Sequence, residues 1–356
     1  MDPKSPETLL SVHLIHRHGN RYPLQYLESF PSVVPSGQLS SNGQVLMKHI
    51  GQTVFKRYCG SLLPPTYSPG LFNFRSTQSE RTRESLCYFQ QGFFEHYRTS
   101  LPPGEEISKD DLSFWHVPSK LDFELRGSCA IKPAFKMMKD QSRGEYCQKL
   151  HSEHKMLISK VETSTGSKVD DKAPFNIFDS LLCNIDLGHP LPPPITTTDI
   201  PLIRYLKEQC LFFPSLTCLM ISLIAALDLD IENPYPAFGS MLAIEIFTDQ
   251  NHDLDNPRVR FVTCLAPTLS EPLQFSECFL RDMGNEHMTV KRMQELWRPV
   301  HDEINSGMFY TERCALDDEE LKRFKNRKVT REIVPLDVGN HVRDHLQPYH
   351  CTSCHH

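Results

Sequence analysis

Apolar positions in the first hundred residues follow the pattern of a strand and then the pattern of a helix, and this order occurs twice. Residues 9–16 are mostly apolar and include the β-branched residues Val12 and Ile15, which predicts a buried strand. Over residues 41–58 large apolar side chains recur at every fourth position, which predicts an amphipathic helix. Residues 71–75 predict a second strand, and the Thr-Gln-Ser-Glu sequence at 77–80 has the form of a capping box that begins a second helix. Strand, loop and helix in this repeated order predict a three-layer α/β/α domain with a mostly parallel sheet.

The same periods return in the second half of the chain. Residues 214–229 are apolar on most sides, which predicts a buried helix. Residues 241–247 and 258–264 predict two strands, and the polar stretch between them favours a hairpin. A further amphipathic helix is expected at 289–298.

These elements divide the chain into three parts. Residues 9–96 and 209–300 are expected to form one discontinuous α/β domain. Residues 97–208 are less regular and charged, and end in a proline-rich run, so we interpret them as an inserted, largely helical cap region. Residues 301–356 are expected to be an irregular C-terminal segment.

Composition excludes several classes of protein. The chain has 356 residues, of which 39% are hydrophobic, enough for an extensive core. Its 38 basic and 44 acidic residues give a net charge of −6, so nucleic-acid binding driven by bulk charge is not expected. Residues 210–227 carry no charge, but a proline and several hydroxyl side chains interrupt them. A buried core helix is therefore favoured there over a membrane span.

The evidence on compartment is divided. Twelve scattered cysteines are many for a reducing cytosol and favour disulfides in the lumen of the secretory pathway: Golgi, lysosome or secreted. Against this, residues 1–8 show no apolar signal-peptide core, and the sequence has no N-glycosylation sequon. Either a leader is absent from this sequence, or the protein is intracellular with reduced thiols.

The strongest chemical pattern is the sequence Arg-His-Gly-Asn-Arg-Tyr-Pro at residues 17–23, which follows the first predicted strand. Ligands of α/β sheets bind at the carboxyl ends of strands. Guanidinium groups match phosphate oxygens, so Arg17 and Arg21 are expected to bind a phosphate. The imidazole of His18, kept neutral by the two positive charges, can then attack phosphorus.

Arg75 ends the second predicted strand, immediately before the second helix. A helix N-terminus also attracts anions. Arg17, Arg21 and Arg75 are therefore expected to surround His18 and form one phosphate pocket.

Residues 17–23 resemble the active-site signature of the histidine acid phosphatases, the second branch of the histidine phosphatase superfamily. The Arg-Ser-Thr sequence at 75–77, with Arg-Thr at 81–82, resembles their second phosphate-binding segment, and parts of 226–247 resemble their third conserved block. The resemblance implies an α/β domain with a helical insert. It also implies that His18 is the nucleophile that becomes phosphohistidine, with Arg17, Arg21 and Arg75 binding phosphate. No metal or cofactor is expected.

Within this family, residues 176–183, 127–129 and 21–24 are most similar to the branch that contains 2-phosphoxylose phosphatase of the Golgi. That similarity suggests a phosphorylated small molecule or phosphosugar as the substrate. The sequence leaves the oligomeric state open.

One motif of the family is missing. Its third block begins with a His-Asp pair about ten residues before an Ala-Leu, here Ala225-Ala226-Leu227, and the acid protonates the leaving oxygen. Counting back reaches Leu216 and Thr217, and the preceding residues 213–215 offer neither a histidine nor an acid. The region upstream also lacks several helical turns and a strand. Loss of a general acid costs about 10²- to 10⁴-fold in rate.

Other candidate donors and sites are weaker. The pairs His252-Asp253 and His301-Asp302 do not precede a buried helix, so each is expected to be a solvated surface pair. The Cys-Thr-Ser-Cys-His-His tail at 351–356 has the form of a haem or zinc motif, but a frayed end or a local disulfide is favoured there.

Three hypotheses about function remain. The chain is expected to be an acid phosphatase that works through phosphohistidine with compromised proton donation. The alternative is a pseudophosphatase that binds a phosphorylated ligand without turnover. A third possibility is an inactive splice or gene-model product that lacks the segment before Leu216.

Overall fold

The computed structural model describes most of the chain. The described residues are 7–27, 29–30, 36–122, 125, 145–169, 174–209, 220, 223–231, 236–248, 253–265, 267, 269, 271–306, 316–333 and 347–349.

The larger of two β-sheets is antiparallel throughout. Its strands β1 (Thr8–His16), β4 (Met241–Thr248), β5 (Arg258–Cys264) and β6 (Ser276–Cys278) lie in that order, and β7 (Met288–Thr289) also pairs with β5. β1 pairs with β4 in a register that joins His16 to Met241. The predicted strands at 9–16, 241–247 and 258–264 and the hairpin are confirmed.

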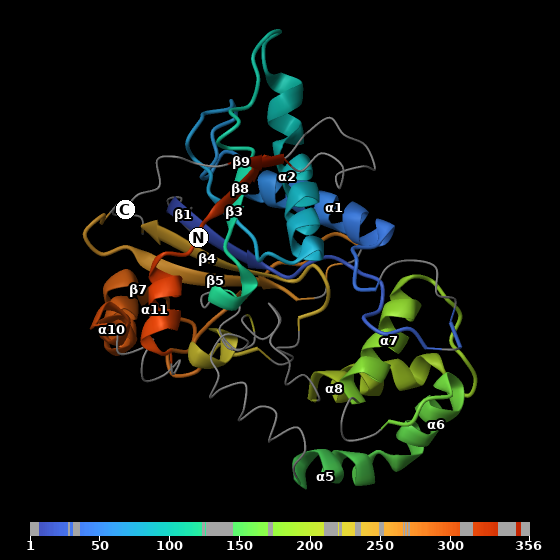
Figure 1. The fold of residues 1–356 in the computed structure, drawn as a ribbon. Coiled ribbons are helices and arrows are strands. Elements are labelled where there is room, and N and C mark those ends of the chain that lie inside the picture. Colours follow the sequence, from blue (N-terminus) through green and yellow to red (C-terminus); the bar gives the residue numbers. More distant parts are fainter. Residues whose placement is uncertain are drawn as a thin grey trace, which may run out of the picture.

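A second sheet lies beside the first (Figure 1). Its order is β2 (Phe74–Arg75), β3 (Ser113–His116), β8 (Thr330–Ile333) and β9 (Gln347–Tyr349). Only β2 and β3 are parallel to each other. The C-terminal segment, for which no regular structure was expected, therefore supplies two strands to this sheet.

The expectation of a mostly parallel sheet is wrong. Repeated strand–loop–helix order favours parallel neighbours only if successive strands share a ladder. Here β1 and β2 belong to different sheets, and β1 takes an antiparallel neighbour more than 220 residues later in the chain. The order of elements along the sequence does not specify this long-range pairing.

Two long helices, α1 (Ser41–Tyr58) and α2 (Glu80–Ser100), pack along each other against the sheets. Their shared core is rich in aromatic rings; Phe93, for example, meets Phe55 edge-on at 5.8 Å between ring centroids. The predicted helix at 41–58 is confirmed, with Ser40 as its N-cap. The capping box predicted at residues 77–80 does not form. The helix α2 begins at Glu80, so its N-cap is Ser79, and the side chain of Ser79 makes no capping hydrogen bond.

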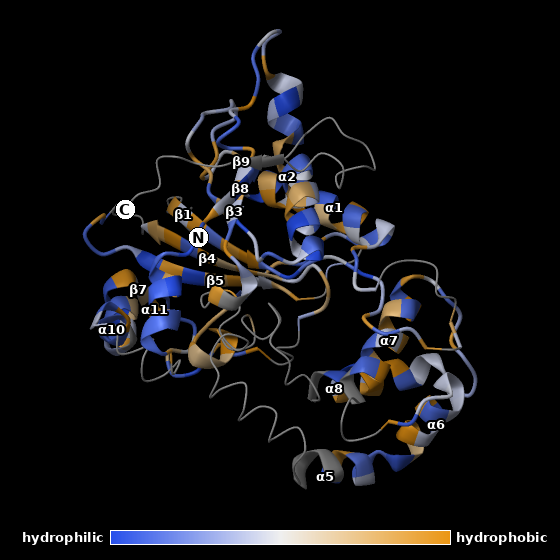
Figure 2. Cartoon of the chain, viewed as in Figure 1, coloured by the Kyte–Doolittle hydropathy of each residue, from blue (hydrophilic) through white to orange (hydrophobic). Residues whose placement is uncertain are grey.

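A separate group of helices follows in the chain. It comprises α5 (Glu145–Glu153), α6 (Lys155–Thr165), α7 (Pro174–Asp186) and α8 (Ile200–Gln209), with short 3₁₀ turns at Ser119–Leu121 and Thr197–Asp199. These helices share an apolar cluster of their own, and Figure 2 shows hydrophobic residues where α7 and α8 meet. The first part of the predicted cap, however, contributes β3 to the second sheet.

Two more helices complete the described structure: α10 (Val290–Ser306) and α11 (Asp318–Lys325). α10 confirms the helix predicted at 289–298 and continues beyond it. Most of the helix predicted at 214–229 lies outside the described residues, although residues 223–226 are helical. Among the described helices, none has the length and apolar character to cross a membrane.

The described cysteines do not support the disulfide expectation. Cys59, Cys87, Cys183, Cys264 and Cys278 are free thiols. The side chains of the other cysteines, including those of the 351–356 tail, lie outside the described residues.

Candidate active site

The loop that follows β1 is anchored on both sides by backbone hydrogen bonds. Arg17 donates its amide to the Ser240 carbonyl (2.8 Å), and Gly239 donates to the His18 carbonyl (2.9 Å). Asn20 accepts from the amide of Ser40, the N-cap of α1 (2.9 Å). The loop is thus fixed between the start of β4 and the start of α1.

Glycines allow the loop to approach α1 closely. A Cβ on Gly19 would stand 2.6 Å from the Gly43 carbonyl oxygen, and a Cβ on Gly43 would stand 2.1 Å from that of Asn20. Both distances are far below van der Waals contact, so any side chain at either position would force the loop away from the helix. The Gly19 amide also donates to the Ser85 hydroxyl of α2 (3.1 Å).

His18 is buried at the centre of this loop, with its two ring nitrogens in different surroundings. Nδ1 lies 2.9 Å from the Gly19 carbonyl oxygen, which only accepts hydrogen bonds, so Nδ1 carries the proton. Nε2 then has the lone pair and accepts from Nε of Arg81 (3.3 Å). This tautomer presents a nucleophilic nitrogen towards a guanidinium.

The surroundings of His18 keep its ring neutral. Burial lowers the pKa of His18 well below its ordinary value, and the charges of Arg81, Arg17 and Arg21 lower it further. The hydrogen bond to Gly19 opposes this shift only in part. His18 therefore retains an unprotonated Nε2 in mildly acidic solution.

The ring of Phe238 lies close to His18 and to three cationic side chains of the site. It lies 5.4 Å from the His18 ring centroid, and the guanidinium carbons of Arg17 and Arg21 lie 4.4 and 5.6 Å from its centre. The Nζ of Lys207 lies 5.4 Å from the same ring. Cation–π contacts with one aromatic ring offset part of the repulsion between these like charges.

Asp179 balances two of these charges. Arg21 donates to both of its carboxylate oxygens (3.0 and 2.9 Å), and Lys207 lies 3.2 Å from one of them. Burial alone would raise the pKa of Asp179, but Lys207 and Arg21 together hold it below its ordinary value. Asp179 is therefore ionised and does not serve as a proton donor.

Arg75 lines the same cavity as His18. Its guanidinium donates to Asp122 (2.7 Å) and lies over the ring of Trp115, at 4.4 Å from the ring centre. Successive side chains of a strand point to opposite faces, and Phe74 occupies the face that packs on the aromatic core. Arg75 lies opposite Trp115 of β3 in the strand register, and Arg81 from the first turn of α2 donates to His18.

Sequence reasoning did not assign roles to Arg81, Phe238, Asp179 or Lys207. For Arg81 a usable signal existed: it falls in the first turn of a predicted helix that starts beside the pocket. The other three come from segments 160 to 220 residues away from His18, and no local pattern connects them to it.

Most of the remaining candidates lie outside the part of the chain that the structure describes. Leu216, Thr217, His252 and the 351–356 tail lie outside the described residues. The side chains of His301 and Asp302 are 71% and 70% exposed, as expected for a solvated pair. Within the described part of the chain, no group of three or more His, Cys, Asp or Glu residues is arranged to hold a metal ion.

Sequence comparison agrees with this geometry. Residues 8–153 match the sequence model of the histidine phosphatase superfamily (branch 2), and they include the loop, α1, β2 and α2. This part of the chain is therefore similar to that superfamily. The narrower similarity to 2-phosphoxylose phosphatase stays a prediction.

Lysosomal acid phosphatases are similar over a longer stretch. That of Rattus norvegicus is 26% identical over 227 residues, which cover 60% of this chain and 52% of the relative. That of Homo sapiens is 26% identical over 222 residues, covering 58% and 50%. The chain thus spans about half the length of the curated relatives that it matches.

Solved phytase structures have the same histidine-phosphatase-like α/β fold. Hafnia alvei phytase in its apo form superposes with a TM-score of 0.60 at 13% identity, over 84% of this chain and 98% of that one. Citrobacter braakii phytase gives 0.58 at 13% identity, over 82% and 98%. At this level of identity the likeness concerns the fold alone.

Proposed function

We propose that this protein is a phosphomonoester hydrolase of the acid phosphatase type that uses His18 as its nucleophile. The observation that carries the proposal is a buried, neutral imidazole whose Nε2 lone pair faces Arg81 while Arg17 and Arg21 lie nearby. The match of residues 8–153 to the sequence model of the histidine phosphatase superfamily supports it.

In the proposed reaction, the His18 Nε2 lone pair forms a bond to phosphorus as the bond from phosphorus to the ester oxygen breaks. The guanidinium groups of Arg17, Arg21 and Arg81 hold the non-bridging oxygens and balance their charge. Water then attacks phosphorus, the P–N bond breaks, and phosphate leaves with the imidazole restored. We propose Arg81 for the third guanidinium because its Nε lies 3.3 Å from Nε2 of His18.

The leaving oxygen requires a proton, and the sequence lacks the His-Asp pair that supplies it in the family. Aryl phosphates leave as weakly basic phenolates and need little protonation, whereas sugar alkoxides need a general acid. We therefore expect turnover of activated esters to exceed that of phosphosugars by a wide margin. A phosphorylated small molecule remains the proposed class of substrate.

The test is hydrolysis of para-nitrophenyl phosphate by the purified chain at mildly acidic pH, compared with the variant His18→Ala. Turnover that the variant lacks, together with a phosphorylated wild-type protein that is labile in acid after quenching, is the expected result. Equal rates for the two proteins would contradict the proposal.

A second function, phosphate binding without turnover, is favoured by the missing proton donor. Vanadate or inorganic phosphate would then raise the melting temperature of the wild-type protein but not of Arg17→Ala, while no ester is hydrolysed. The absence of any oxyanion effect on melting would rule out both functions.

A further inference from the structure

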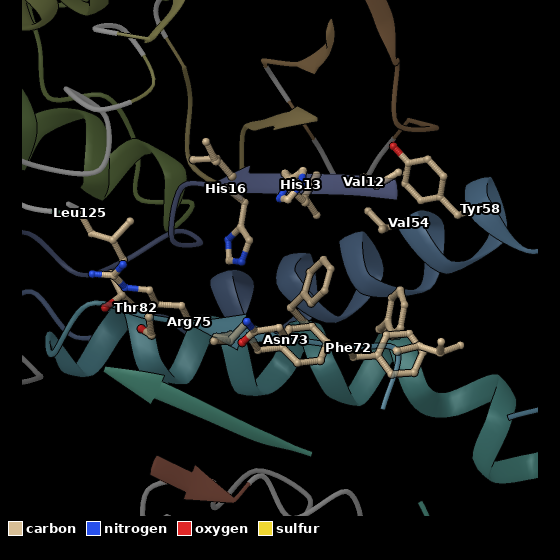
Figure 3. A pocket seen from close by; sticks show the side chains of 18 of the residues that line it. Val12, His13, His16, Val54, Tyr58, Phe72, Asn73, Arg75, Thr82 and Leu125 are labelled. Atoms are coloured by element: carbon tan, nitrogen blue, oxygen red, sulfur yellow. The ribbon is translucent and has the colours of Figure 1, made fainter. Parts of the chain in front are cut away.

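A cavity of about 600 Å³ separates the two β-sheets, next to the site of His18. One wall is the segment Val12–His16 of β1, and the opposite wall is residues 71–77, which include β2 (Figure 3). Apolar and aromatic side chains of α1 and α2 form its floor: Val54, Tyr58, Leu86, Phe89 and Phe93. We call this cavity the inter-sheet slot.

The walls of the slot are strand edges. Five consecutive residues of β1 and seven consecutive residues through β2, 71–77, line it. Side chains of consecutive strand residues point to opposite faces, so an unbroken run of residues can border a cavity only along the edge, where the backbone N–H and C=O groups lie. β1 pairs with β4 and β2 with β3, each on its other edge, and in the described residues no strand pairs with the two edges that border the slot.

Two facing strand edges specify the type of ligand. Buried backbone N–H and C=O groups require hydrogen-bond partners, which an apolar small molecule does not provide. An extended peptide presents N–H and C=O groups on both of its edges and can pair with both walls at once. In Figure 3 the labels run in the same direction from Val12 to His16 and from Phe72 to Arg75, so one inserted strand meets both walls in a constant orientation.

The composition of the slot specifies the side chains of the ligand. Its floor is aromatic and aliphatic, and the ring of His16, which projects into the slot, stacks on Phe89 at 5.3 Å and has a pKa lowered by burial. Apolar side chains suit this floor. At one end the slot reaches His18, where Arg17, Arg21 and Arg81 gather, and this charge favours an anion.

We propose that the inter-sheet slot binds an extended, apolar segment of a partner protein as a β-strand, with an acidic side chain at the end that meets Arg81 and His18. The run Val12–His16 is about 16 Å long, the length of an ordinary five-residue strand. Pairing on both sides joins the two sheets into one. The inserted acid shares the anion site of the proposed function, but strand pairing does not depend on catalysis.

The probe is an acetylated, amidated heptapeptide, Lys-Val-Thr-Val-Ile-Val-Asp, added to the full-length protein. We expect slower hydrogen exchange at the backbone amides of 12–16 and 72–75. Two matched peptides separate the contribution of backbone hydrogen bonds from that of the terminal negative charge. N-methylation at alternate residues removes hydrogen-bond donors and abolishes the protection, and replacement of the terminal aspartate by lysine weakens binding at least tenfold. Inorganic phosphate competes with the acidic peptide more than with the lysine peptide.

Three outcomes would overturn the proposal. These are no protection of either wall at peptide concentrations up to about 1 mM, equal protection by the N-methylated peptide, and protection confined to the outer edges of the sheets. All three comparisons use the wild-type protein, so they do not depend on whether a variant folds.

Two variants on α1 provide a second test. Val54→Phe enlarges a side chain that lines the slot, whereas Val45→Phe enlarges one that is 57% exposed on the same helix. Only Val54→Phe is expected to abolish peptide protection; equal protection in both folded variants would contradict the slot as the site. Hydrolysis of para-nitrophenyl phosphate measures turnover and hydrogen exchange measures peptide binding, so failure of this proposal is distinguished from failure of the proposed function.

Discussion

At the scale of single residues, the phosphate site depends on which arginine faces His18. Arg75 and Arg81 are six positions apart, and both belong to the segment that resembles the family motif. Arg75 is neutralised by Asp122, whereas Arg81 donates directly to His18 Nε2. We propose that Arg81, in the first turn of α2, is the phosphate ligand of the two.

Alanine variants of Arg75 and Arg81 test which arginine binds phosphate. Arg81→Ala is expected to lower kcat/KM for an aryl phosphate by about 10²-fold, because one donor to the transition-state oxygens is removed. Arg75→Ala is expected to change kcat/KM only a few-fold, since its charge is used by Asp122. Steady-state kinetics of both variants provides the measurement, and the reverse order would return the role to Arg75.

His18 also makes stability dependent on pH. Because its folded-state pKa lies well below the ordinary value of 6.5, the unfolded state binds more protons between the two pKa values. The free energy of unfolding therefore falls as pH falls below 6.5. Urea unfolding between about pH 7 and pH 5 should show a smaller decrease for His18→Gln than for wild type. The exposed His301→Gln is the control and should retain the wild-type slope.

At the scale of elements, the contact between α1 and α2 relies on glycine. A Cβ on Gly51 would stand 2.0 Å from the carbonyl oxygen of Phe89, and one on Gly92 would stand 2.0 Å from that of Lys48. Both are backbone atoms of the opposite helix, so no side-chain rearrangement relieves the clash. The two helices carry the N-cap beside the loop and Arg81, so their spacing also affects the site.

Gly51→Ala and Gly92→Ala are each expected to destabilise the fold by about 1–3 kcal/mol, despite the higher helix propensity of alanine. Thermal or urea unfolding of the two variants and of wild type measures this loss of stability. Val45→Ala, an exposed change on the same helix, should remain within about 0.5 kcal/mol of wild type. Unchanged stability in both glycine variants would mean that the helices lie farther apart.

At the scale of the whole molecule, Asp179 connects the helical group to the active-site loop. It lies on α7, and its partners are Arg21 in the loop and Lys207 on α8. All three side chains are 5% exposed or less. One buried carboxylate thus determines where α7 and α8 lie relative to His18.

Asp179→Ala leaves Arg21 and Lys207 as neighbouring buried cations. Removing one partner of a buried ion pair costs about 3–5 kcal/mol, so we expect a loss of that order in the free energy of unfolding. Saturating phosphate should recover part of it, because the anion then compensates the two cations. If unfolding with and without phosphate matched wild type, Asp179 would not be a charge partner of this loop.

The sequence by itself determined the local features of this protein. The periods of apolar residues specified β1, α1, β4, β5 and α10, because they depend on neighbours within a few positions, and the Arg-His-Gly loop predicted His18 as a candidate nucleophile. Tertiary structure alone decided the antiparallel pairing of β1 with β4, the contact of Arg81 with His18, and the position of Asp179 and Lys207 beside the loop. It also decided the slot between the sheets. These features depend on contacts between segments far apart in the chain and on the direction in which each side chain points, which packing sets and the local pattern does not.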